Sequence, residues 1–201
     1  MDTRTYDVAL VPDEFLATKA IEASEELRQF GSRFTLDGTE YYPHLSLYML
    51  RIQPDELAQL QHVLKSLAQE ITVTALSATA FCQKRGYIDV EYQKTPELEA
   101  LQTRVLQIAS SFRSGLLPHD AASLSSSTGM ALESLETFGY KYTGELFRPH
   151  LTLTRLQDER PVPLSALGRI DQYHGAFAQL ALFELDDDYA CVRRLASYSL
   201  V

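Results

Sequence analysis

A five-residue pattern, Pro-His-Leu-hydroxyl-Leu, occurs twice in this sequence, at residues 43–47 and again at residues 149–153. The two histidines, His44 and His150, are 106 positions apart, and the rest of the chain shows little internal likeness. A single histidine in an apolar run is usually a packed or hydrogen-bonded residue. With average residue usage, however, chance recurrence of the whole pattern falls well below about one in a thousand. The repeat therefore predicts two related halves, each with a histidine in the same setting.

Each copy has the composition of a β-strand, over residues 41–52 and 147–156. Successive side chains of a strand point to opposite faces. The leucines of each copy would anchor the strand in a core, and the opposite face would carry the polar residues: His44, Ser46 and Tyr48 in the first copy, and His150, Thr152 and Thr154 in the second. Residues two apart lie roughly 6.6 Å along a strand. An imidazole and a hydroxyl at that separation can contact different oxygens of one phosphate.

Strands and helices alternate along the rest of the chain. Apolar spacing and helix-start residues predict four helices, at residues 18–30, from 54 to 67, from 95 to 112 and, more weakly, at 120–137. Alternating apolar residues predict a first strand that ends at Pro12, an antiparallel pair at 71–82 and 86–93, and two final strands at 176–185 and 190–200. We expect an α+β fold: one domain over residues 1–201 with two pseudo-symmetric lobes around a central cleft, each lobe an antiparallel sheet with helices packed outside.

Charge and composition restrict the partners. The formal net charge is −9, from 27 acidic and 18 basic residues, and no basic run occurs. An extended nucleic-acid footprint is therefore disfavoured, although a small or terminal phosphate remains compatible. No apolar run is long enough for a membrane helix, the N-terminus does not resemble a signal peptide, and the two cysteines lack a paired spacing. We expect reduced thiols, no membrane association and a cytoplasmic location; the oligomeric state stays open.

Two H-x-[S/T] motifs about a hundred residues apart, each on a predicted strand, resemble the 2H phosphoesterase superfamily. That superfamily includes bacterial 2′-5′ RNA ligase-like proteins and plant cyclic phosphodiesterases. The resemblance covers most of the chain and implies the four catalytic residues His44, Ser46, His150 and Thr152. It implies metal-independent hydrolysis of a cyclic phosphodiester, in a 2′,3′-cyclic nucleotide, an ADP-ribose cyclic phosphate or an RNA terminus, with no cofactor.

The chemistry of these side chains agrees with that implication. Histidine has an ordinary pKa of about 6.5, so it can accept or donate a proton near neutrality. One neutral imidazole would take a proton from the attacking oxygen, and the other, protonated, would give a proton to the leaving oxygen. Ser46 and Thr152 would bind the non-bridging phosphate oxygens. The sequence does not indicate which histidine plays which role.

Five neighbours of the motifs are candidate substrate contacts. Tyr41, Tyr42 and Phe147 precede the histidines and could stack on a base. Arg148 and Arg155 flank the second histidine and could contact phosphate. The alternatives are core packing for the aromatic rings and ordinary surface exposure for the arginines.

Three other functions stay open beside the phosphodiesterase. One is a non-catalytic module that binds a nucleotide or an RNA end on the same fold, and another is 2′-5′ RNA ligation. The third is a metallohydrolase that uses His44 and His150 as metal ligands beside acidic residues. The remaining histidines and the acidic turn at residues 186–188 match no compact metal signature and are expected at the surface.

Overall fold

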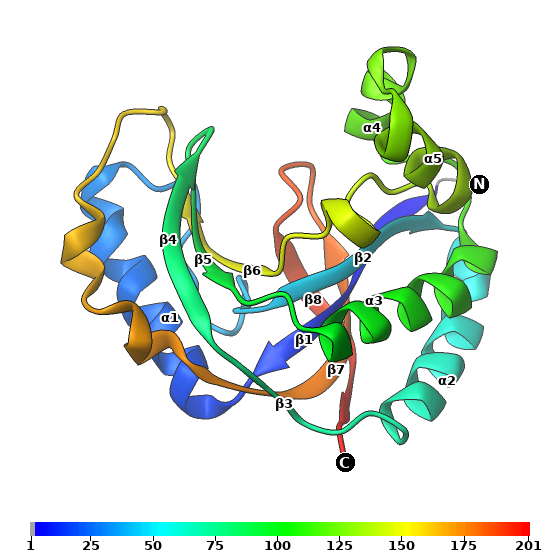
Figure 1. Cartoon of the computed structure of the whole chain (residues 1–201), viewed down its shortest axis with the longest axis horizontal. Helices are drawn as coiled ribbons and strands as arrows, with labels where there is room; N and C mark the ends of the chain where they lie inside the picture. The colour runs from blue at the N-terminus through cyan, green and yellow to red at the C-terminus, as the bar shows by residue number, and fades with distance from the viewer. Residues whose placement is uncertain (1–2) are drawn as a thin grey trace.

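The computed structural model describes residues 3–201 (Figure 1). Its main elements are β1 (Arg4–Pro12), α1 (Glu14–Leu27), β2 (Leu45–Ile52), α2 (Leu57–Ala68), β3 (Thr74–Leu76), β4 (Ala78–Lys84), β5 (Tyr87–Tyr92), α3 (Pro96–Ala109), α4 (Pro118–Ser123), α5 (Gly129–Phe138), β6 (His150–Arg155), β7 (Gly175–Leu185) and β8 (Cys191–Ser199). Short 3₁₀ turns extend or join several of them. No helix among residues 3–201 is both long and apolar enough to cross a membrane.

The strands form two antiparallel sheets. The first has the order β2-β1-β7-β3, with β8 also paired to β7, and the second has the order β4-β5-β6. The two strands of the repeated motif, β2 and β6, are therefore edge strands, and these two edges contact each other. The expected α+β fold with two antiparallel sheets is confirmed. The contact between the edges brings the two halves of the repeat together.

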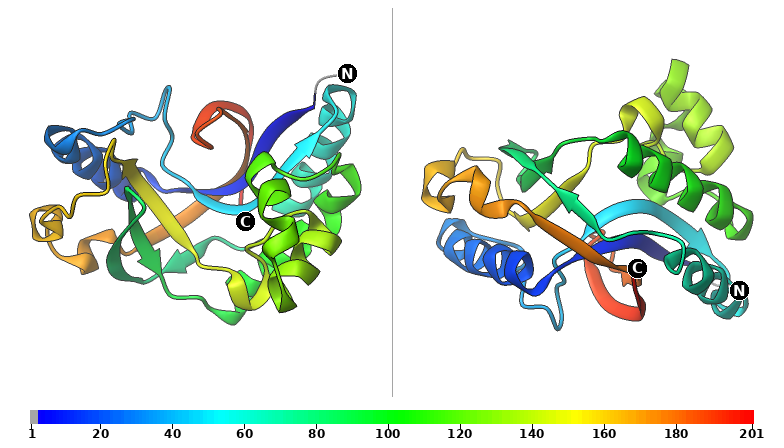
Figure 2. Two further views of the ribbon diagram at one scale, coloured as in Figure 1. Left: turned by 90° about the horizontal axis from the view of Figure 1, so that it is seen from above. Right: turned by 60° about the horizontal axis from the view of Figure 1, so that its bottom comes forward.

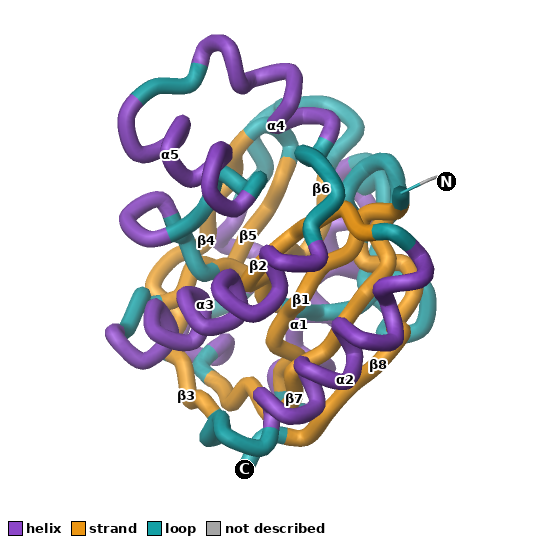
Figure 3. The backbone as a smooth tube through the Cα atoms, turned by 90° about the vertical axis from the view of Figure 1, so that its right-hand side faces the viewer, coloured by secondary structure: helices purple, strands orange, loops and turns teal. Residues whose placement is uncertain are grey.

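Helices pack on the outside of these sheets. α3 packs against β2, and α2 packs against β7 and β8 (Figure 3). α1 contacts β1 and β6 and lies at the opposite end of the molecule from α4 and α5 (Figure 2). One connected apolar core includes residues of both sheets and of α1, α2 and α3.

Helix boundaries differ from the sequence prediction at two places. The helix predicted at 18–30 begins at Glu14, because the Asp13 carboxylate caps it by accepting a hydrogen bond of 2.8 Å from the backbone N–H of Leu16. The helix predicted at 120–137 is two helices, α4 and α5, separated by a 3₁₀ turn and a short extended segment. The helix predicted from residue 95 is confirmed as α3, with the Thr95 hydroxyl as its cap.

Both motif strands contain a β-bulge at the same distance from the histidine. In β2, Ser46 pairs with Ala9 and Tyr48 with Val8, so Leu47 is the extra residue. In β6 the partners of Thr152 and Thr154 are likewise adjacent residues of β5, which makes Leu153 the extra residue. A bulge turns the side chains that follow it to the other face. The two halves of the repeat therefore resemble each other in the position of the β-bulge as well as in sequence.

The bulges correct two sequence predictions. Tyr48 and Thr154 do not share a face with the histidines, because each follows a bulge and is fully buried. The Tyr48 hydroxyl donates a hydrogen bond of 2.5 Å to the carbonyl of Phe138, and the Thr154 hydroxyl donates one of 2.6 Å to the carbonyl of Phe34. The polar face of each copy is thus reduced to the histidine and the hydroxyl two residues later.

Replacing Tyr48 with Phe should lower the free energy of unfolding by about 1–3 kcal/mol, because it leaves the Phe138 carbonyl without its partner. Urea titration followed by circular dichroism measures this change. Tyr142 is 45% exposed, so Tyr142→Phe serves as the control and should change the stability little. Equal midpoints for the Tyr48→Phe variant and the wild type would contradict the structural role given to this hydroxyl.

Candidate active site

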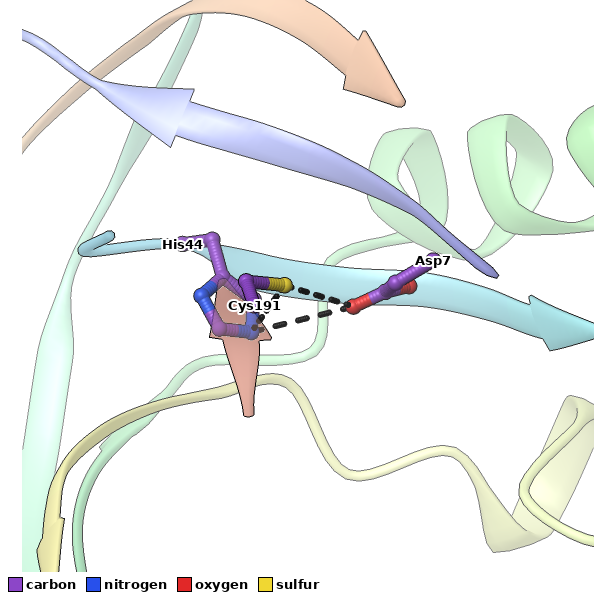
Figure 4. A group of neighbouring side chains, drawn as sticks. All are labelled: Asp7, His44 and Cys191. Atoms are coloured by element: carbon purple, nitrogen blue, oxygen red, sulfur yellow. Dashed lines mark hydrogen bonds and ion pairs between the residues drawn. The ribbon is translucent and has the colours of Figure 1, made fainter. Parts of the chain in front are cut away.

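The first half of the site is built around a buried aspartate on β1. His44 directly precedes β2, and its Nδ1–H donates to the Tyr42 carbonyl at 2.6 Å. Its Nε2 atom lies 3.7 Å from Oδ2 of Asp7 (Figure 4). The Ser46 hydroxyl donates to the same carboxylate oxygen at 2.5 Å. The side chain of Asp7 is fully buried, and that of His44 is 14% exposed.

The second half repeats this arrangement. His150 is the first residue of β6, and its Nδ1–H donates to the Arg148 carbonyl at 2.7 Å. The Thr152 hydroxyl donates to Oδ1 of Asp89, on β5, at 2.8 Å. In each half, therefore, a backbone carbonyl two residues earlier fixes the imidazole, and a buried aspartate on the neighbouring strand holds the hydroxyl. Both Nε2 atoms keep a lone pair for proton transfer or for a ligand.

Burial shifts the pKa values of these groups. Removal from water raises the pKa of Asp7 to about 8, while the hydrogen bonds from Ser46 and Cys191 act in the opposite direction. Removal from water, with a smaller contribution from the charge of His150, lowers the pKa of His44 to about 4, although the hydrogen bond to the Tyr42 carbonyl acts in the opposite direction. The strands β2 and β6 contact each other, so the two motif strands are neighbours. Burial likewise raises the pKa of Asp89, against the charge of His150 and the hydrogen bond from Thr152.

The two halves differ in what surrounds the histidine. Cys191, the first residue of β8, places its sulfur 3.4 Å from Nε2 of His44 and 3.9 Å from Oδ2 of Asp7. The ring of Phe183 packs beside His44, with the ring centres 5.8 Å apart. In the second half the other cysteine, Cys82, pairs in register with Asp89, but no comparable group of ligand atoms forms among residues 3–201.

The aromatic residues that precede the motifs have partners of their own. Tyr41 stacks on Phe34 at 5.3 Å, and Tyr42 donates its hydroxyl proton to the Thr39 carbonyl at 2.5 Å. Phe147 is 4% exposed and belongs to the main core. The prediction that Phe147 stacks on a base is therefore corrected, because its ring has no open face. The core-packing alternative describes this residue.

The two arginines are both paired with carboxylates. Arg148 forms an ion pair with Glu91, which raises the arginine pKa. Arg155 pairs with Asp188 at 2.8 Å and lies over the ring of Tyr87, 4.8 Å from its centre. Each guanidinium stays half-exposed. A phosphate ligand would compete with these carboxylates for the arginines.

The histidines outside the two motifs lie at the surface, as expected. His62, His119 and His174 are exposed, and His119 lies in α4. The acidic turn that includes Asp186 and Asp188 is held by backbone hydrogen bonds to Asp186 and by ion pairs to Asp188.

Sequence reasoning missed three residues of the site: Asp7, Asp89 and Cys191. A weak sequence feature could have identified the two aspartates, because each is an acidic residue within an apolar strand and is followed by valine. Cys191 carried none, because its position depends on how β8 pairs with β7 near the end of the chain.

Residues 48–184 match a family described as protein of unknown function (DUF1045). The chain belongs to the DUF1045 family. The matched region contains His150 and Thr152 and begins just after the first motif. No curated protein matches this DUF1045 protein.

Several crystal structures share the fold of this DUF1045 protein at low sequence identity. Escherichia coli LigT complexed with phosphate is 14% identical, with a TM-score of 0.59 over 100% of this chain and 99% of LigT. A structure described as a phosphoesterase is 12% identical, with a TM-score of 0.57 and the same coverage. The protein TT0787 of Thermus thermophilus is 18% identical, with a TM-score of 0.56 over 98% and 97% of the two chains. The DUF1045 protein therefore has a LigT-like fold along its length.

Proposed function

We propose that this protein is a metal-independent phosphodiesterase of the 2H type that hydrolyses a cyclic phosphodiester. One observation carries the proposal. The two halves present the same set of groups: an imidazole fixed through Nδ1 by a backbone carbonyl, a hydroxyl two residues later, and a buried aspartate behind that hydroxyl. Such fixed side chains on strands are the rigid mount that catalysis requires.

The reaction divides between the two imidazoles. Nε2 of one histidine takes the proton of the attacking water, the new P–O bond forms, and Nε2 of the other histidine gives a proton to the leaving ribose oxygen. Water adds to the ester, one P–O bond replaces another, and the two histidines end with their protonation states exchanged. Because burial lowers the pKa of His44, we assign His44 as the histidine that accepts the first proton and His150 as the one that donates a proton to the leaving oxygen.

The hydroxyls stabilise the phosphate charge only if their protons are free. Thr152 has one hydroxyl proton and donates it to Asp89 when that carboxylate is ionised. When Asp89 carries a proton, it can donate to Thr152 instead, and Thr152 can then donate to a phosphate oxygen. Burial favours this protonated state, because it raises the pKa of Asp89. We therefore assign Asp89 as a positioning residue that acts through Thr152.

Replacing Asp89 with Asn should remove part of the pH dependence of stability. A raised pKa means that the folded state keeps a proton that the unfolded state loses, so the free energy of unfolding falls as pH rises above the ordinary aspartate pKa of about 3.9. Asparagine does not ionise, so the variant should gain stability relative to wild type as the pH rises above about 3.9. Urea unfolding at several pH values measures this difference. The exposed residue Asp55 gives the control variant Asp55→Asn, which should show no such trend.

A small nucleotide is the proposed ligand. Crystal structures of E. coli LigT contain phosphate, 3′-AMP, ATP or NADP⁺, which supports a nucleotide phosphate in a fold of this kind. The net charge of −9 is unfavourable for a long nucleic acid. We accordingly propose a 2′,3′-cyclic nucleotide, an ADP-ribose cyclic phosphate or an RNA-terminal cyclic phosphate as substrate.

The test is a screen of these cyclic phosphates in the presence of EDTA, with the products identified by phosphorus NMR. We expect hydrolysis to a single monophosphate isomer. Nucleotide binding without turnover would favour the non-catalytic module, and joining of RNA ends would favour ligation. Activity that EDTA abolishes and zinc restores would favour a metallohydrolase.

A further inference from the structure

Asp7, His44 and Cys191 form a compact group of three potential metal ligands, the only such group found among residues 3–201 (Figure 4). They come from β1, from the residue before β2 and from the start of β8. Three well-separated parts of the chain thus converge on one point. The strands that carry them are fixed by the pairings of the first sheet.

The separations of the ligand atoms suit a tetrahedral cation. The three distances are 3.7 Å between Asp7 Oδ2 and His44 Nε2, 3.4 Å between His44 Nε2 and Cys191 Sγ, and 3.9 Å between Cys191 Sγ and Asp7 Oδ2. Zinc bonds of about 2.0 Å to nitrogen or oxygen and about 2.3 Å to sulfur place tetrahedral ligands roughly 3.3–3.6 Å apart. Shifts of a few tenths of an ångström would therefore complete one face of the tetrahedron.

The surroundings also match those of a metal ligand. Nδ1–H of His44 donates to the Tyr42 carbonyl, and this is how proteins usually orient a metal-binding imidazole with Nε2 toward the ion. Asp7 is fully buried, and its Oδ1 atom has no hydrogen-bond partner within residues 3–201. Its side chain has no lysine or arginine ion-pair partner among residues 3–201. A divalent cation would balance the charges of this carboxylate and of the Cys191 thiolate, with His44 neutral.

We propose that Asp7 Oδ2, His44 Nε2 and Cys191 Sγ form a three-ligand site for zinc. A thiolate, an imidazole and a carboxylate are the ligand types that zinc takes in proteins. Binding forms three metal–ligand bonds, and the thiol proton, together with any proton on the carboxyl group, leaves to solvent. The fourth position is open to water. The side chain of His44 is 14% exposed, so the ion can reach it from solvent.

This site has a regulatory consequence that rests on the proposed function. Zinc would occupy the lone pair of His44 Nε2, which the paired-histidine reaction needs for proton transfer. The bound ion would therefore switch the phosphodiesterase off. The second half of the site would stay unblocked, because His150 and Asp89 have no cysteine sulfur grouped with them among the described residues.

Cobalt(II) is the probe that tests the site without any substrate. We expect one cobalt per chain, with a near-ultraviolet charge-transfer absorption that only a thiolate ligand gives, and we expect zinc to displace the cobalt. Cys191→Ser should lose this absorption, and Asp7→Asn should weaken cobalt binding. Cys82→Ser is the matched control, because Cys82 is the only other cysteine and lies in the second half; it should keep the full absorption. Circular dichroism confirms that each variant is folded.

The outcomes separate this proposal from the proposed function. A wild-type cobalt spectrum without thiolate charge transfer, or one that Cys82→Ser abolishes, would overturn the zinc site whether or not the protein hydrolyses cyclic phosphates. If hydrolysis is found in EDTA, zinc should suppress it in the wild type and in Cys82→Ser but not in Cys191→Ser. Stimulation by zinc would overturn the inhibitory role.

Discussion

Replacing either His44 or His150 with alanine should lower kcat for hydrolysis of a 2′,3′-cyclic nucleotide by about 10²–10⁴-fold, which is the usual contribution of a positioned general acid or base. Both variants should show a large loss of kcat, because the reaction needs one imidazole to accept a proton and the other to donate one. Initial rates in EDTA at saturating substrate measure the effect. The double variant should fall little further than the worse single variant, because the two groups act as one unit.

His62→Ala is the matched control for these variants. His62 is exposed on α2, outside both motif strands. Its replacement should leave kcat unchanged. That result would show that the loss of a histidine outside the motifs does not affect hydrolysis. Full activity of either motif variant would refute the division of acid and base roles between His44 and His150.

Removing either motif hydroxyl should lower kcat by about 10²–10³-fold, as the loss of one donor to a developing negative charge typically does. Ser46→Ala and Thr152→Val each delete the hydroxyl that the neighbouring aspartate positions. The loss should appear in kcat more than in KM, because the phosphate oxygens gain charge in the transition state. Steady-state kinetics on the same substrate resolve the two parameters.

Thr154→Val provides an internal comparison only two residues away. The bulge at Leu153 turns Thr154 to the interior, where its hydroxyl donates to the Phe34 carbonyl. This variant should lose stability, by about 1–3 kcal/mol, and keep its kcat. A loss of kcat equal to that of Thr152→Val would show that the two hydroxyls are not on different faces.

Much of the fold could be predicted because local patterns specify it. The alternating residues of β5 and the capped start of α3 depend only on neighbours in sequence. The bulges at Leu47 and Leu153 could not be predicted, because a period-two pattern carries no sign of one extra residue. The same pattern therefore predicts the wrong face for Tyr48.

In the site, too, the residues of a local sequence pattern could be predicted, and those that depend on distant strand pairing could not. The four motif residues were visible because the pattern is repeated, and the structure places each histidine and its hydroxyl in the same local setting. Asp7 and Cys191 reach His44 only through strand pairing across almost the whole chain, so no spacing in the sequence predicts them. Phe147 is buried by tertiary packing, so its position beside the motif in the sequence did not predict its environment.

The pairing of β1 with β7 has a consequence for biosynthesis. It joins residues 4–12 to residues 175–185, nearly the full length of the chain apart. Proteins emerge from the ribosome N-terminus first, and contacts between distant segments form slowly. A nascent chain therefore exposes one long edge of β1 until β7 has been synthesised, and during that time this edge is open to pairing with other chains.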